Sequence, residues 1–125
     1  MEVPELMASK VNTGDVVARM REIHGALDSF AQTKRTTAAG EVADGAGRTE
    51  TWVASSDARL DKRQVSALRD GEVAVQGEGH AETTLLDAAV AAGKRLRTIA
   101  ASWSICEDCA KKLLQAGVQI LTKIR

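Results

Sequence analysis

The chain has 125 residues, a length typical of one domain with a single packed core. Its 44% apolar content favours a folded domain over disorder, and one Phe, two Trp and no Tyr indicate a mainly aliphatic core. The formal net charge is zero, which argues against strong non-specific binding to polyanions. No apolar run approaches the roughly 18 residues of a membrane-spanning helix, so no membrane partner is expected.

The first half of the chain is predicted to form a helix, a β-hairpin and a second, short helix. A helix over residues 14–32 is indicated by apolar residues at three- and four-residue steps, namely Val16, Met20, Ile23, Leu27 and Phe30. His24 borders this stripe, and we interpret it as a packed or half-exposed residue rather than a ligand. Residues 36–42 and 48–55 are predicted strands, joined by a turn at Asp44-Gly45. Residues 60–70 are a predicted short helix with apolar contacts at Leu60, Val65 and Leu68.

The second half is predicted to alternate helices and strands. Residues 80–92 form a helix that ends at Gly93, and residues 95–102 form a strand. Residues 106–116 form the next helix, which ends at Gly117, and residues 118–122 form a last strand. A helix that joins two strands of one sheet makes them parallel neighbours. The chain is therefore expected to be a single α/β domain with a mixed sheet, in which residues 14–32 are an additional N-terminal helix.

Four polar residues occur at the predicted starts of two helices. His80 and Glu82 lie in the first turn of one helix, and Cys106 and Cys109 lie in the first turn of the next. Because the strand between them is short, both helix N-termini can emerge at one edge of the sheet. One imidazole and two thiolates make a three-ligand zinc site with an open fourth position for water, the layout of a catalytic zinc.

Each half of this constellation has alternative interpretations. His80-Ala81-Glu82 is also typical of a helix start, where the dipole favours a glutamate. A C-x-x-C pair also occurs in thiol redox proteins and in four-cysteine structural zinc sites. The redox motif follows an early strand of its fold, whereas this pair follows a late one, and no other cysteine is present for a structural site. The two halves together, about 25 residues apart, are more specific than either alone.

Gly79-His80-Ala81-Glu82 followed by Ser104-Ile105-Cys106-Glu107-Asp108-Cys109 resembles the zinc-dependent nucleoside and nucleic-acid deaminase superfamily, whose signature is H-x-E…P-C-x-x-C. The short domain resembles above all the deaminase domains at the C-termini of bacterial polymorphic toxins, including the YwqJ-like group. The resemblance covers about residues 36–122. It implies a cytidine deaminase-like α/β/α sandwich with a mixed sheet.

The resemblance also implies roles for individual residues. His80, Cys106 and Cys109 would hold one Zn²⁺, and Glu82 would carry protons between water and the base as general base and then general acid. One position departs from the signature, because Ile105 stands where the family usually has Pro. Proline there would preset the first helical turn, so the departure bears on the fine geometry of the site.

The substrate contacts are predicted from the few aromatic and hydroxyl residues near the motifs. Trp52 and Trp103 are candidates for stacking on a base, although both can equally fill the core. Ala81 lies between the two motif residues of the first helix. Ser55, Ser56 and Ser104 are candidates for hydrogen bonds to a base edge, although loop hydroxyls more often cap turns.

The charge distribution bears on the substrate class. Residues 1–92 carry 10 Lys and Arg against 15 Asp and Glu, whereas residues 93–125 carry 7 against 2. The basic residues of the C-terminal third either form solvated faces or create a local field for a phosphate backbone: Arg95, Arg97, Lys111, Lys112, Lys123 and Arg125. The resemblance favours cytosine in single-stranded DNA, with double-stranded DNA, RNA, adenine and free nucleosides as alternatives.

The resemblance to toxin domains has consequences for partners and location. It implies a cognate immunity protein and an effector that is secreted or injected and acts in the cytoplasm of a recipient cell. The opening residues MEVPELMASK lack the basic and apolar regions of a signal peptide, so no targeting signal is predicted in this chain. Two other classes remain open, a non-catalytic zinc-stabilised binding module and a thiol redox protein that uses Cys106 and Cys109.

Overall fold

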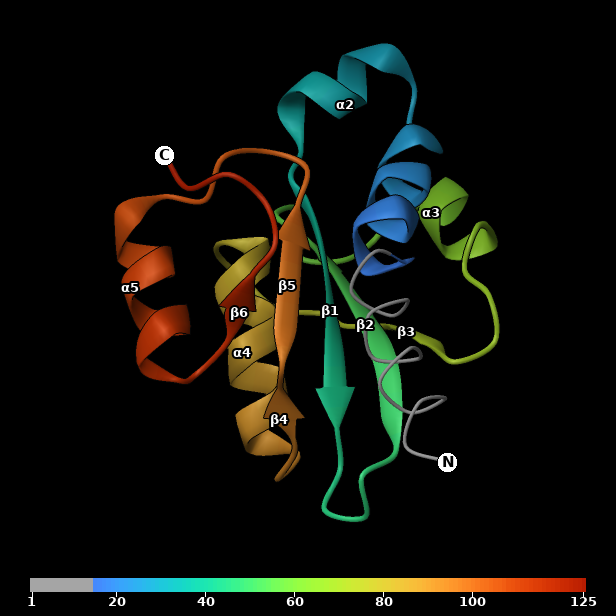
Figure 1. Cartoon of the computed structure of the whole chain (residues 1–125). Coiled ribbons are helices and arrows are strands. Elements are labelled where there is room, and N and C mark those ends of the chain that lie inside the picture. Colours follow the sequence, from blue (N-terminus) through green and yellow to red (C-terminus); the bar gives the residue numbers. More distant parts are fainter. Residues whose placement is uncertain (1–14) are drawn as a thin grey trace.

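The computed structural model describes residues 15–125, which form a mixed α/β fold (Figure 1). Residues 15–25 are helical, and the remaining helices are α2 (Ser29–Lys34), α3 (Lys62–Ser66), α4 (Ala81–Ala91) and α5 (Glu107–Gln115). The strands are β1 (Thr37–Ala43), β2 (Thr49–Ser55), β3 (Glu72–Ala74), β4 (Arg95–Leu96), β5 (Thr98–Ala101) and β6 (Gln119–Ile120). None of the helices in this part of the chain has the length and apolarity needed to cross a membrane.

The strands form one open, mixed sheet in the order β3-β2-β1-β5-β6, and β4 pairs with the end of β1. Strand β1 is antiparallel to β2, β4 and β5, whereas β2 pairs with β3 and β5 pairs with β6 in parallel. The carboxyl ends of β2, β3, β5 and β6 therefore lie at the same edge of the sheet. Ligands of open α/β sheets bind at such an edge.

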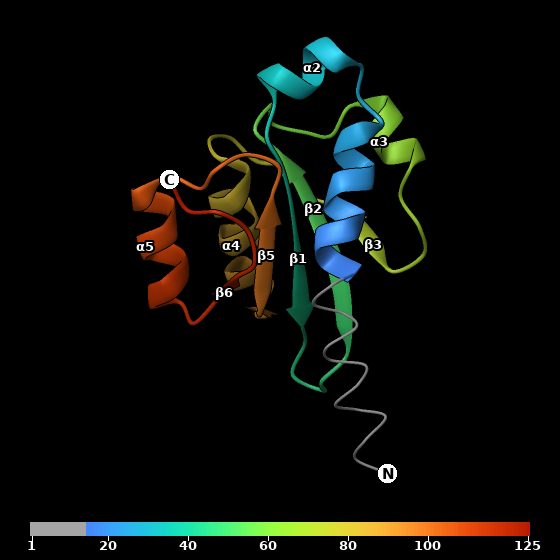
Figure 2. The same ribbon diagram turned by 45° about the horizontal axis from the view of Figure 1, so that its top comes forward.

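Helices cover both faces of the sheet (Figures 1 and 2). On one face, α4 and α5 pack on alternate residues of the strands, including Ala38, Val42 and Ala54. On the other face, Val16, Met20 and Ile23 of the N-terminal helix pack on Ala39 and Val53. Because neighbouring strand residues point to opposite faces, the small residues of β1 let helices approach from both sides.

The predicted hairpin and the parallel pairing of the last two strands are confirmed. Strands β1 and β2 pair from Thr37 with Ser55 to Ala43 with Thr49. Their turn is held by Asp44, whose Oδ1 accepts hydrogen bonds from the N–H groups of Ala46 and Arg48. β5 and β6 are parallel neighbours on either side of α5 in the sequence, as the strand–helix–strand order predicts.

The prediction of one helix over residues 14–32 is wrong. The helical run ends at residue 25, and a separate helix, α2, begins at Ser29. Asp28 starts α2 because its carboxylate accepts a hydrogen bond from the N–H of Ala31 at 2.8 Å. Phe30 therefore leaves the apolar stripe and is 72% exposed. The residue at position 14 lies outside the described part of the chain.

Two further predictions differ from the structure in extent. The helix predicted over residues 60–70 is limited to α3, where Asp61 and Gln64 form a capping box, and Val65 is exposed rather than a core contact. The strand β3 that follows was not among the predicted strands. It pairs with β2, and Glu72 at its start forms an ion pair with Arg19 of the N-terminal helix at 2.7 Å.

The strand predicted over residues 95–102 is interrupted at Arg97, which separates β4 from β5. The Arg97 N–H donates to the Glu41 carbonyl, and the Arg97 carbonyl accepts from the Gln119 N–H. Gly40 makes the close approach of this segment to β1 sterically feasible, since a Cβ at that position would lie 2.5 Å from the Thr98 carbonyl oxygen. Alternation of side chains predicts a strand here, but it carries no signal for the break.

Candidate metal centre

His80, Cys106 and Cys109 come together at the carboxyl edge of the sheet. Their potential ligand atoms all lie within 4.8 Å of one another, so this group could hold one metal ion. The three side chains differ in exposure, since His80 is exposed, Cys106 is partly buried and Cys109 is buried. A ligand set that is open on the His80 side leaves room for a further, exchangeable ligand.

The local backbone explains why two of these side chains are available. His80 is the N-cap residue of α4 and Cys106 is the N-cap residue of α5, and both have extended backbone angles. Neither side chain makes the usual capping hydrogen bond to its own helix. The imidazole and the thiol therefore point away from the helix ends instead of satisfying them.

Packing of the two helices brings the three residues to one place. α4 and α5 lie side by side on the same face of the sheet, and both begin at the end where the carboxyl end of β5 lies (Figures 1 and 2). Cys109 is in the first turn of α5, one helical turn after Cys106. The spacing C-x-x-C thus presents both sulfur atoms toward the start of α4, where His80 lies.

The glycines before His80 have structural roles that the sequence did not predict. Gly77 packs so closely on α4 that a Cβ there would lie 2.6 Å from Cγ2 of Thr84. Gly79 has a φ of +92°, a left-handed conformation that places His80 at the helix start. Gly77 is thus a point of tight packing, and Gly79 is a left-handed position directly before the helix.

A pocket of about 320 Å³ lies at the metal-ligand group. His80, Ala81, Glu82 and Cys106 line one part of it. The rest is lined by Thr36, Ser56, Gly79, Trp103, Ser104 and Arg125. Its volume is within the range of pockets that hold small organic ligands.

Glu82 is the buried acid of this pocket, with only 4% of its surface exposed. Burial raises the pKa of Glu82, and a backbone hydrogen bond and the nearby His80 and Arg125 side chains oppose this rise only in part. A raised pKa makes the carboxylate a stronger base, which suits a group that takes a proton from water.

The buried position of Cys109 governs the acidity of its thiol. Burial raises the pKa of the Cys109 thiol to about 12, and contact with Cys106 and Glu82 adds to the rise. The thiol must lose this proton to become a metal ligand, and a metal cation can displace it.

The two tryptophans lie in different environments. Trp52 is buried on the α4 face of the sheet, and the Lys94 ammonium lies 5.5 Å from its ring centroid. Because Lys94 follows the carboxyl end of α4, this places Trp52 at the far end of that helix from His80, outside the pocket lining. Trp103 lines the pocket and is 63% exposed. The core-filling interpretation thus fits Trp52 and not Trp103.

Two of the three serines predicted to contact the substrate line the pocket, and the third does not. Ser104 and Ser56 line the pocket together with the predicted Ala81. Ser55 does not line it, because its side chain is fully buried and its hydroxyl accepts a hydrogen bond from the Asp57 N–H. His24 is held by hydrogen-bond contacts with Thr37 and the Gln32 carbonyl, and it is outside the metal-ligand group.

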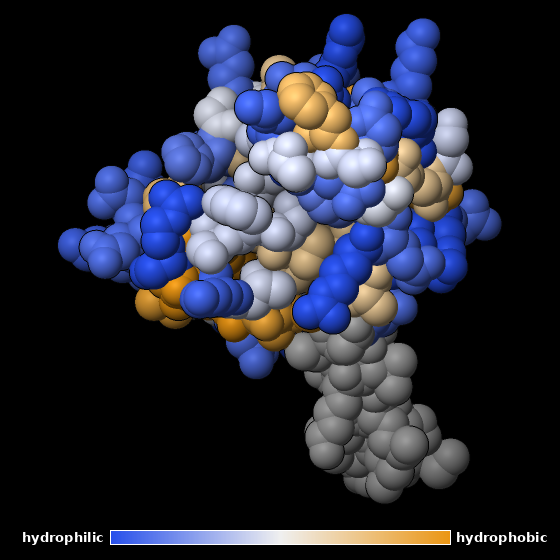
Figure 3. Space-filling view, turned by 90° about the horizontal axis from the view of Figure 1, so that it is seen from above, coloured by the Kyte–Doolittle hydropathy of each residue, from blue (hydrophilic) through white to orange (hydrophobic). Residues whose placement is uncertain are grey.

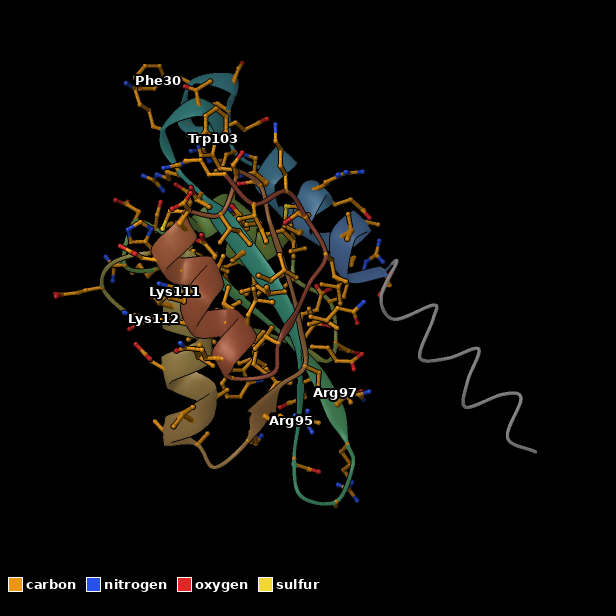
Figure 4. All side chains as sticks on the ribbon, turned by 60° about the vertical axis from the view of Figure 1, so that its left-hand side comes forward. Phe30, Arg95, Arg97, Trp103, Lys111 and Lys112 are labelled. Carbon is orange, nitrogen blue, oxygen red and sulfur yellow. The ribbon has the colours of Figure 1, made fainter. Side chains whose placement is uncertain are left out.

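The basic residues of the C-terminal third do not form one continuous, positively charged surface. Arg95 and Arg97 lie at the opposite end of the molecule from Trp103, and Lys111 and Lys112 project from α5 (Figure 4). Arg97 is also paired with Glu41 at 3.2 Å. Of this set, Arg125 lines the pocket of the metal-ligand group.

Sequence reasoning missed Thr36 and the specific position of Arg125 at the site. A short parallel bridge between Ile105 and Ile124 places Arg125 there, and the Arg125 side chain donates to the Ser104 carbonyl at 3.5 Å. No local sequence signal predicts this bridge, since its two residues are far apart in the chain. Thr36 precedes β1 and reaches the site through its N–H, which donates to the Ser56 hydroxyl.

Comparisons with protein-family models, curated proteins and solved structures gave no match to this chain. The geometry of the site therefore carries the functional argument.

Proposed function

We propose that this chain is a zinc-dependent hydrolytic deaminase that converts cytosine to uracil in single-stranded DNA. The observation that carries the proposal is the convergence of His80, Cys106 and Cys109 at a pocket that the buried Glu82 also lines. The resemblance of the two motifs to the deaminase signature supports the same assignment. With it we propose a cytidine deaminase-like three-layer arrangement for the α/β fold.

The donor set fits zinc. One imidazole nitrogen and two thiol sulfurs are ligands that Zn²⁺ accepts, and three protein ligands leave a fourth position for a reactant. The exposed position of His80 and the adjoining pocket put that open side where a small ligand can enter. When bound, zinc would supply a hydroxide nucleophile from water at neutral pH.

The protein's own residues would then orient the base and move protons. Glu82 would accept one proton from water and deliver it to the ring nitrogen of cytosine, and would then carry the second proton of the same water to the departing amine, so that cytosine and water give uracil and ammonia. The raised pKa of Glu82 supports a carboxyl group that is both a base and an acid in one cycle. Trp103 and the Ser56 and Ser104 side chains line the wall against which the base would lie.

An assay on several substrates distinguishes the proposed deaminase from the alternative functions. Zinc-loaded protein is incubated with single- and double-stranded DNA, RNA and free nucleosides, and sequencing and product analysis report C-to-U and A-to-I conversion. We expect C-to-U conversion in single-stranded DNA and none with Glu82→Ala. Bound zinc with no conversion of any substrate would instead indicate a non-catalytic zinc-stabilised module. The toxin role, with its immunity partner and delivery to a recipient cell, is a further prediction from the resemblance.

A further inference from the structure

A second pocket also borders Trp103, with a volume of about 390 Å³. It shares Trp103 and Ser104 with the pocket of the metal-ligand group, so these two residues form a common wall. The N-terminal helix contributes Arg21 and His24 to the second pocket, and the segment after β6 contributes Lys123. Two neighbouring pockets with a shared aromatic wall can hold two successive units of one ligand.

The second pocket is positively charged. Arg21 and Lys123 are exposed, and no Asp or Glu lines the pocket. Neither basic residue forms an ion pair with another residue of the range 15–125. The hydroxyls of Ser102 and Thr122 already accept backbone hydrogen bonds, each at 2.9 Å. The charged groups open to a ligand are therefore cations, which favours an anion such as phosphate.

Two of the three aromatic side chains of this chain are exposed at this end of the molecule. Trp103 is 63% exposed and Phe30 is 72% exposed, and both project from the same end (Figure 4). Viewed onto this end, side chains of intermediate hydropathy lie near the centre and hydrophilic side chains around them (Figure 3). Exposed aromatic rings beside cations are the elements of a surface that binds single-stranded nucleic acid, because bases stack on the rings and phosphates contact the cations.

We propose that the second pocket binds the nucleotide next to the target base of a single-stranded nucleic acid. The neighbouring base stacks on Trp103, and the phosphate between the two nucleotides contacts Arg21 and Lys123. This inference rests on the proposed deaminase function, because it takes the pocket of the metal-ligand group as the site of the target base. It identifies the substrate as a polynucleotide rather than a free nucleoside.

Binding of a short, fluorescently labelled oligothymidylate to the zinc-loaded chain tests this subsite. The oligomer has no cytosine, so the anisotropy signal is independent of deamination. Trp103→Ala should weaken binding about tenfold, the lower part of the range for one stacked base. The double variant Arg21→Ala/Lys123→Ala should weaken binding and reduce the slope of log K against log salt by about 0.7, the contribution of the one phosphate that both side chains contact. Oligouridylate in the same assay shows whether the subsite prefers DNA or RNA.

A matched control removes the same number of positive charges from the other end of the sheet. Arg95 lies far from Trp103 (Figure 4), and Arg48 lies in the β1–β2 turn at that same distant end (Figure 1). Arg48→Ala/Arg95→Ala should leave the affinity and the salt slope unchanged. Equal losses in the two double variants, or displacement of the oligomer by an acidic peptide at the same charge concentration, would overturn the proposal.

The outcomes separate this inference from the proposed function. Oligomer binding that depends on Arg21, Lys123 and Trp103 without any deamination supports the subsite and contradicts the enzyme assignment. Deamination of free cytidine at the same rate as of an oligonucleotide, unaffected by Arg21→Ala/Lys123→Ala, supports the enzyme and contradicts the subsite.

Discussion

The backbone N–H of Ile105 donates to the carbonyl of Lys123 at 3.0 Å, which ties the start of α5 to the C-terminal segment. The Arg125 N–H returns a bond to the Ile105 carbonyl at 2.7 Å, and the Ile105 side chain is fully buried. This pairing needs an N–H at position 105, which proline lacks. Ile105 stands where the deaminase signature has proline. Its backbone pairing with the C-terminal segment holds Arg125 at the site.

Ile105→Pro should therefore destabilise the protein by about 3 kcal/mol or more, through the lost hydrogen bond and the smaller buried side chain. Ile105→Val keeps the N–H and should lower the free energy of unfolding by about 1 kcal/mol. Urea denaturation of both variants measures the difference. Equal stability of the two would show that the pairing with Lys123 contributes nothing.

Gly79 controls the placement of His80 through its backbone angle. A Cβ at Gly79 meets no atom within 4 Å, so Gly79→Ala introduces backbone strain without a clash. We expect a loss of about 1–2 kcal/mol in stability and weaker metal binding, because relief of the strain moves His80. Gly45→Ala, also in open space but without the left-handed conformation, is the control and should change neither quantity. Thermal unfolding with and without zinc measures both effects.

Metal binding should strengthen as pH rises. Because the pKa of Cys109 is raised to about 12, the thiol holds its proton through the neutral range and must release it to become a ligand. The association constant for zinc should increase at least about tenfold per pH unit, since each thiol that becomes a ligand releases one proton. Competition with a chromophoric chelator between pH 6 and pH 8 measures the slope. A flat profile in wild type would contradict a thiolate ligand at Cys109, and Cys109→Ser should bind zinc weakly at every pH.

The ion pair between Arg19 and Glu72 should make stability depend on pH in the acid range. Burial alone would raise the pKa of Glu72, but hydrogen bonds from Arg19 and the Arg69 N–H hold it below the ordinary value of 4.5. A lowered pKa stabilises the fold above the ordinary value, and this contribution is lost as pH falls through the lowered value. Glu72→Gln leaves Arg19 buried without its charge partner and should cost about 3 kcal/mol at pH 7.

The difference between wild type and Glu72→Gln should shrink as pH falls below the ordinary value of 4.5 and through the lowered pKa of Glu72. Glu22 is a suitable control because it contacts the same guanidinium at 3.3 Å from an exposed position. Glu22→Gln should change the free energy of unfolding by less than about 1 kcal/mol. Urea denaturation at pH 3.5 and pH 7 tests both variants. A difference that grows toward acid pH would contradict the assigned direction of the Glu72 pKa.

The parts of the fold that local sequence signals determine could be predicted from sequence. The hairpin turn at Asp44, the start of α4 at His80 and the parallel pairing of β5 with β6 follow from short-range patterns. The break before α2 was missed because apolar periodicity continues through Leu27 and Phe30 while the Asp28 cap ends the helix. β3 was missed because it is stabilised by pairing with β2 and by the distant Arg19.

The same distinction applies to the site. His80, Cys106 and Cys109 lie in two motifs whose positions at helix starts were readable, and the structure brings these three side chains together. Arg125, Thr36 and the second pocket depend on contacts between residues distant in sequence, which no local pattern encodes. Trp52 and Trp103 were equivalent in sequence, and only packing separates the buried one from the exposed one.

The most direct test of the account compares wild type with Glu82→Gln at equal zinc content. The substitution keeps the size of the side chain but removes its ability to carry a proton. Uracil formation in a cytosine-containing single-stranded oligonucleotide is measured over time, with zinc per chain determined in the same samples. We predict uracil formation by wild type and a loss of at least about 100-fold in Glu82→Gln with one zinc still bound. Equal rates in the two proteins, or no uracil from fully zinc-loaded wild type, would contradict the account.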